Sequence, residues 1–132
     1  MAITYRIDAE RGRLHMMVAG EFTASEIAIV LREVASSPEL PDGFTAISDH
    51  SRVTRALTAS QLLLVVSIME EFPGRFAGVR WAVVSPRPAA YGMLRVLAAR
   101  AQLALGMGVQ IFFDTQRATE WLDSASEAHV PA

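Results

Sequence analysis

The segment of residues 44–66, FTAISDHSRVTRALTASQLLLVV, contains a full strand-to-helix unit and decides much of the fold. Its first five residues, FTAIS, are mostly apolar and predict a strand. Thr58 and Gln61 match the capping box, in which a threonine hydroxyl and a side chain three residues later satisfy free amides at the start of a helix. The apolar run after Gln61 therefore predicts a helix. We expect it to end near the EFPG of residues 71–74, because proline and glycine interrupt helices.

The chain before this unit predicts a hairpin and a helix. Ile3–Asp8 alternates apolar and polar residues, and Arg13–Gly20 follows after a turn at Gly12, so both segments are predicted strands. Thr23 and Glu26 form a second capping-box pattern. The helix that begins there is expected to end before the two prolines of SSPELPDG.

The chain after the unit repeats the strand-to-helix pattern. Residues 79–85, VRWAVVS, predict a strongly apolar strand. Pro88–Leu105 predicts a long helix, because proline suits a first helical turn. Residues 109–113 predict a fifth strand, and Asp114 or Thr115 is expected to cap a last helix.

The order β-β-α-β-α-β-α-β-α predicts an α/β fold with four helices and a sheet of about five strands, mixed but mostly parallel. Strands that alternate with helices imply right-handed crossovers, and the first hairpin adds one antiparallel strand. We expect the strands at residues 44–48 and 79–85 to be parallel neighbours or nearly so. We also expect Ile47, Val83 and Ile111 to be buried in central strands.

The composition is that of a globular domain. Hydrophobic residues make up 52% of the 132 residues and charged residues 20%, which excludes an intrinsically disordered chain. A net charge of −2 gives no indication of nucleic-acid binding, and no apolar run is long enough to span a membrane. With no cysteine and no close spacing of histidine and carboxylates, the sequence predicts no disulfide, metal site or cofactor. We therefore expect a single cytoplasmic domain over residues 1–132, without a signal peptide.

Asp49, His50 and Ser51 are the three residue types of a hydrolytic triad, and they directly follow the strand predicted before them. Neighbouring side chains diverge along an extended backbone, whereas a triad requires convergence. The sequence has no G-x-S-x-G elbow, and neither His15 nor His129 is an evident partner. We interpret the three residues as the polar end of a strand and predict no catalytic residues.

Six short motifs follow one another in order along nearly the full chain. They are VAG at residues 18–20, DHSRV at 49–53, TASQL at 58–62, WAVVS at 81–85, FFD at 112–114, and Ala118, Trp121 and Leu122. The pattern at residues 49–62 resembles the STAS domain of anti-sigma-factor antagonists, in which a strand ends in Asp-x-Ser-x-Val and Asp-Ser-Ser/Thr-Gly-Leu opens the next helix. The whole chain resembles the bacterial STAS-like group that shares a fold with CRAL-TRIO lipid-transfer domains.

The resemblance implies a non-catalytic module that binds protein partners, and it places a possible phosphoacceptor at Ser60. Some STAS domains are switched by phosphorylation of the residue that opens this helix, where a phosphate meets free amides and the positive end of the helix dipole. The chain departs from the family pattern on both sides, since Thr58 replaces an aspartate and Gln61 replaces a glycine. We therefore predict that Ser60 is a vestigial phosphoacceptor in an ordinary capped helix.

The helices carry more apolar surface than one sheet contact requires. From Leu62 to Phe72, apolar residues cover well over half of the helical circle, and Pro88–Leu105 is also mostly apolar. This surface either packs on neighbouring helices or remains for a second subunit, a protein partner or a lipid-like ligand.

Three function classes therefore compete, and an enzyme is the one that the residues support least. One is a regulatory or scaffolding STAS-like module that acts through protein contacts, as a homo-oligomer. The alternative is a binder of a small apolar or lipid-like molecule between the helices. Arginines after the predicted strands, Arg52, Arg55 and Arg87, are either anion ligands or plain surface residues. The residues expected at an interaction or ligand surface are Asp49, Ser51, Arg52, Thr58, Leu63, Val66 and Arg87.

Overall fold

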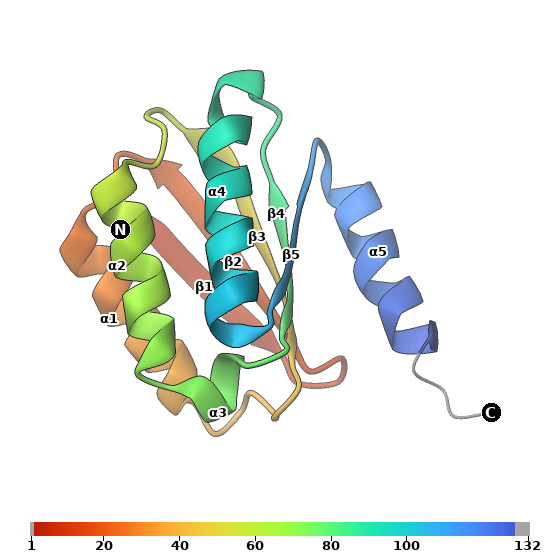
Figure 1. The fold of residues 1–132 in the computed structure, drawn as a ribbon. Helices are drawn as coiled ribbons and strands as arrows, with labels where there is room; N and C mark the ends of the chain where they lie inside the picture. The colour runs from red at the N-terminus through yellow and green to blue at the C-terminus, as the bar shows by residue number, and fades with distance from the viewer. Residues whose placement is uncertain (1, 129–132) are drawn as a thin grey trace.

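The computed structural model describes residues 2–128 and contains one five-stranded sheet with helices on both faces (Figure 1). The strands lie across the sheet in sequence order and are β1 (Ile3–Asp8), β2 (Arg13–Gly20), β3 (Thr45–Val53), β4 (Arg80–Val84) and β5 (Gly108–Phe112). β1 and β2 form an antiparallel hairpin, whereas β2 to β5 are parallel. The predicted α/β class with a mixed, mostly parallel sheet is confirmed, as is the parallel pairing of β3 with β4.

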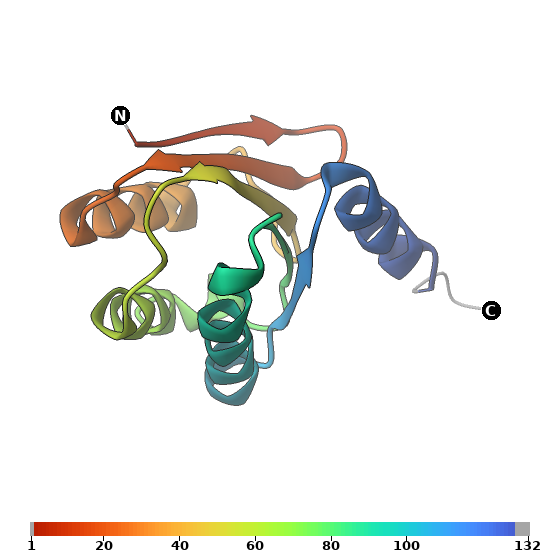
Figure 2. The same ribbon diagram turned by 90° about the horizontal axis from the view of Figure 1, so that it is seen from above.

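The helices divide unequally between the two faces of the sheet. They are α1 (Ala24–Ser36), α2 (Ala59–Glu70), α3 (Pro73–Phe76), α4 (Pro88–Leu105) and α5 (Thr115–Ala128). Seen from above, α1, α2 and α4 lie on one face of the curved sheet and α5 on the other (Figure 2). Each of the three crossovers moves one strand further in the same direction, so right-handed connections place their helices on the same face. We call this the three-helix face and the opposite one the outer face.

Alternation along the strands sorts buried residues between these faces. On β3, Ala46 belongs to the main core under the three helices, whereas Ile47 belongs to a smaller core under α5. The smaller core consists of Ile47, Ala82, Val84, Ala118 and Leu122. Two separate hydrophobic clusters therefore lie back to back across one sheet.

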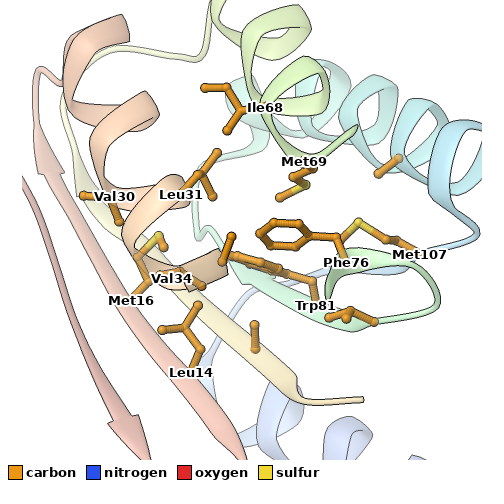
Figure 3. Packing of buried hydrophobic residues seen from close by; sticks show 14 of the residues in the cluster. Leu14, Met16, Val30, Leu31, Val34, Ile68, Met69, Phe76, Trp81 and Met107 are labelled. Carbon is orange, nitrogen blue, oxygen red and sulfur yellow. The ribbon is translucent and has the colours of Figure 1, made fainter. Parts of the chain in front are cut away.

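The centre of the main core is aromatic. Met69 of α2, Phe76 of α3 and Trp81 of β4 point toward one another (Figure 3). Phe76 is fully buried and packs edge-on against Phe44, with ring centroids 6.1 Å apart. Its ring also lies 6.5 Å from that of Trp81. Such aromatic pairs stabilise a core beyond the area they bury.

The helix starts follow the sequence with one exception. The N–H of Gln61 donates to Thr58 Oγ1 at 3.1 Å, and the N–H of Thr58 donates to Gln61 Oε1 at 3.0 Å, so this capping box is complete. At α1 only half of the motif forms, because the N–H of Glu26 donates to Thr23 Oγ1 at 3.2 Å without a return bond. Glu26 Oε2 is instead buried without a hydrogen-bond partner among the described residues.

The third strand is longer than predicted. β3 runs to Val53, so Asp49, His50 and Ser51 lie inside the strand and not after it. The reason is the length of β2, whose last residues continue the pairing past a shift in register and place Gly20 opposite Val53.

The expected burial of the strands is correct in part. Ile47 and Val83 are 5% and 3% exposed, on the interior strands β3 and β4. Ile111 is only half-buried and lies on β5, so its expected place in a central strand is wrong. β5 is an edge strand because the chain adds no strand beyond it within the described residues.

A short extra helix, α3, gives five helices where the sequence predicts four. Pro73 occupies its first turn, so the residues expected to end one helix begin another. Arg75 holds α3 in place by donating to the carbonyl oxygens of Ala35 and Leu40, at 3.0 and 2.7 Å, and to Asp42 at 2.8 Å. His129 lies outside the described residues.

Candidate binding cavity

An apolar cavity of about 90 Å³ lies between the sheet and the helices of the three-helix face. Its lining includes Met16, Val18 and Val83 from the strands, Leu31 from α1, Val65 and Met69 from α2, and Leu97 and Ala101 from α4. The polar side chains in the lining are Ser48, His50 and the indole of Trp81. A space with this composition suits an apolar molecule that carries a hydrogen-bonding group.

Ser48, His50 and Trp81 form one hydrogen-bond chain. Trp81 Nε1–H donates to Ser48 Oγ at 3.1 Å, and Ser48 Oγ lies 3.2 Å from His50 Nε2. An indole only donates, whereas a hydroxyl both accepts and donates, so every group is used when the Ser48 hydroxyl donates to His50 Nε2. We therefore assign the neutral tautomer of His50 with its proton on Nδ1. Within the described residues Nδ1 has no hydrogen-bond partner, which leaves one donor for a bound molecule.

The electrostatics of the cavity agree with a neutral imidazole. Burial lowers the pKa of His50 to about 4, and the neighbouring Asp49 carboxylate opposes this shift only in part. His50 is therefore uncharged at neutral pH, so the cavity contains no ion that would repel an apolar ligand.

Asp49 and Ser51 do not complete a triad with His50. Asp49 lies on the outer face, where it lines a separate hollow with Arg6 and His15. Its Oδ1 accepts the N–H of exposed Ser51 at 2.9 Å. No described carboxylate is hydrogen-bonded to His50, so the divergence expected of adjacent strand residues is what the geometry shows.

A second hollow of about 200 Å³ lies at the carboxyl ends of β3 and β4. Phe22, His50 and Leu57 line both this hollow and the cavity, so we call the second hollow the mouth. Ligands of open α/β sheets commonly bind at this edge. The mouth therefore offers an entrance that passes directly beside His50.

The arginines after the predicted strands separate in the structure. Arg55 and Arg87 both line the mouth, and Arg55 also pairs with Glu21 at 3.3 Å. Arg52 is exposed on β3 and is not part of the lining. The structure thus brings together two of the three arginines considered as anion ligands.

The other expected site residues lie apart from the cavity. Ser60 is exposed in the first turn of α2, and Thr58 is occupied as its cap. Leu63 is 51% exposed, whereas Val66 is buried; neither lines the cavity or its mouth.

The sequence analysis missed the Ser48–His50 pair. The available signal was strand alternation, since residues two apart lie on the same face of a strand. Ending the predicted strand at Ser48 removed that signal. The third member, Trp81, comes from β4, and its contact depends on the parallel pairing of β3 and β4.

In residues 2–128 no helix is long and apolar enough to cross a membrane. The same residues contain no group of three or more histidine, cysteine or carboxylate side chains placed to hold a metal ion.

Comparison with known proteins gives a structural match. Neither the protein-family models nor the curated protein sequences match this chain. The crystal structure of an uncharacterized protein of the DUF3478 family from Shewanella loihica PV-4, which has a SpoIIAA-like fold, is similar with a TM-score of 0.64. The sequences are 18% identical, over 92% of this chain and 94% of that chain. An identity this low relates the folds alone, and on that ground this chain has a SpoIIAA-like, or STAS-like, fold.

Proposed function

We propose that this STAS-like domain is a non-catalytic binding module that takes a small apolar molecule into the cavity under α1, α2 and α4. The observation that carries the proposal is the cavity lining, in which apolar side chains surround a single hydrogen-bond chain. Ligand pockets typically combine such a lining with a few placed polar groups. The broad apolar surface of α2 supports the same function, because Val65 and Met69 line the cavity.

The absence of a catalytic role is part of the proposal. His50 is hydrogen-bonded to Ser48, and the hydroxyl in turn accepts from Trp81. A serine nucleophile needs a base that is oriented and electrostatically supported by a third group, usually a carboxylate. The nearest candidate, Asp49, faces the other side of the sheet.

The test is a titration with 1-octanol as a neutral probe, followed by native mass spectrometry. We expect one molecule per chain. Val65→Phe fills the cavity from α2 and should abolish binding, whereas Leu64→Phe changes the adjacent half-buried residue, which does not line the cavity. Equal binding by both variants and the unmodified chain would contradict the proposal, provided that circular dichroism shows all three folded.

A second candidate function, contact with a protein partner or a second copy, is supported by exposed apolar residues on α2 and α4. Leu103 is 89% exposed, and Leu63, Tyr91 and Val96 are each exposed by 45% or more. Exposed apolar residues favour association when they form a contiguous patch. Light scattering over a concentration series should then show a dimer that Leu103→Glu weakens. Phe113→Glu, which changes a residue 63% exposed and outside both helices, is the control.

A further inference from the structure

The cavity is too small to hold a large ligand by itself. An engineered apolar cavity of about 150 Å³ in a protein core binds benzene. The cavity here measures about 90 Å³, and the mouth adds about 200 Å³. A ligand of more than a few heavy atoms therefore extends past His50 into the mouth, and its outer end meets the groups that line the mouth.

The mouth is lined by the hydroxyl-bearing side chain of Ser85. Ser85 is 4% exposed and follows β4 directly. Its backbone N–H donates to the carbonyl oxygen of Phe112 at 2.9 Å, but its side chain has no hydrogen-bond partner among residues 2–128. A hydroxyl that lines a hollow and has no partner in the protein can donate to, or accept from, a group that enters the hollow.

The first turn of α4 adds a free backbone donor. α1 and α2 have threonine caps, whereas Arg87 at the N-cap of α4 makes no side-chain capping bond and Pro88 has no N–H. The N–H of Ala90 donates to the carbonyl oxygen of Arg87 at 3.1 Å. The N–H of Ala89, also in the lining of the mouth, has no intrahelical acceptor at this position and lies at the positive end of the helix dipole.

The charge of the mouth is positive. Arg55 and Arg87 line it, and no acidic residue is among its lining residues. Arg87 makes no ion pair with any residue in the described range. Guanidinium groups, a hydroxyl and a helix-start amide are the donors that proteins use for carboxylate and phosphate oxygens.

We propose that the mouth binds an anionic head group, a carboxylate or a phosphate monoester, of the ligand whose apolar part occupies the cavity. This assignment rests on the proposed function and specifies its ligand class: a small amphiphile that enters apolar end first. The head group then receives hydrogen bonds from the Ser85 hydroxyl and the Ala89 N–H and pairs with Arg87. The apolar part of the ligand passes His50.

The test compares three probes with the same eight-carbon chain: 1-octanol, octanoate and octyl phosphate. Isothermal titration should show octanoate or octyl phosphate binding about tenfold more tightly than octanol, with a preference that declines as salt is added. The ratio between the two anions identifies which head group the mouth accepts. Arg87→Gln should remove most of the anion preference and should lower octanol affinity far less than it lowers the affinity for the anions. Arg52→Gln, which removes an exposed arginine outside the mouth, should leave the preference intact.

The outcomes separate this inference from the proposed function. If octanol fails to bind, the cavity proposal fails. If octanol binds but neither anion binds more tightly, or if Arg87→Gln and Arg52→Gln behave alike, the head-group site is wrong while the cavity remains. Ser85→Ala provides a second variant in a different segment, and it should lower the affinity for the anions more than the affinity for octanol.

Discussion

The two faces of the sheet show how one strand builds two different environments. His50 faces three helices and is half-buried, and burial lowers its pKa to about 4. Its neighbour Asp49 faces an open hollow of about 350 Å³ with Arg6 and His15. The three-helix face thus encloses an apolar space with one polar chain, whereas the outer face places Arg6, His15 and Asp49 around an open hollow.

The outer face is held mainly by α5, through a small core and one buried arginine. Arg13 is 5% exposed and donates to Thr45 Oγ1 at 3.0 Å and to Asp123 of α5 at 2.9 Å. Ala118 and Leu122 of α5 pack on the same face of the sheet as the Arg13–Asp123 ion pair. We predict that the three-helix face contributes most of the stability and contains the ligand site. The outer face should contribute less to stability.

The largest effect is expected from Phe76→Ala. The side chain is fully buried between Phe44 and Trp81, so its removal should cost about 3–5 kcal/mol of unfolding free energy. Leu122→Ala, at the centre of the smaller outer core, should cost less, about 2–3 kcal/mol. Urea denaturation measures both. A greater loss for Leu122→Ala would reverse the ranking of the two faces.

The next effect is a dependence of stability on pH that comes from His50. Its folded pKa of about 4 lies below the pKa of 6.5 of a free histidine, so between these values the unfolded chain binds a proton that the folded chain does not. Stability should therefore be complete above pH 6.5 and fall by about 3 kcal/mol as the pH drops to 4.

Two variants isolate the contribution of His50. His50→Asn should flatten the stability profile between pH 6.5 and 4, as measured by urea denaturation at each pH. His15→Asn is the control from the outer face, where burial and then Arg6 also lower the pKa of the histidine. Loss of the pH dependence in His15→Asn alone would show that the sensitive group is on the outer face.

The smallest effect is expected at Ser60, which we propose is a vestigial phosphoacceptor. Ser60→Ala should leave partner binding unchanged. Ser60→Asp should shift stability by only about a few tenths to one kcal/mol, because the residue is exposed in the first turn of α2. Phosphate on Ser60 in protein from the native host, together with loss of a partner in Ser60→Asp, would show a working switch.

Local patterns were sufficient for most of the fold. The capping box at Thr58, the proline at the start of α4 and the alternation of β1 predict elements from neighbouring residues alone. The length of β3 depends on its pairing with β2, and the edge position of β5 depends on what lies beside it. A local sequence pattern does not predict such tertiary contacts.

The candidate site was less predictable for the same reason. The sequence indicates Arg55 and Arg87 as candidate anion ligands. It does not indicate Ser48, Trp81 and Ser85, because these residues line a cavity or its mouth only once the helices cover the sheet. The apolar surplus of α2 indicated something beyond one sheet contact. Only the structure shows the reason, which is that residues of α2 line a cavity.

The central claim is that the three-helix face encloses a ligand cavity and the outer face does not. Methyl-resolved NMR during a titration with 1-octanol tests it directly, because each face has its own buried methyl groups. We predict saturable shifts at Val18 and Ala101, which line the cavity, and no change at Ala118 and Leu122 in the outer core. Unchanged Val18 and Ala101 signals at saturating probe, or equal shifts in both sets, would contradict the account.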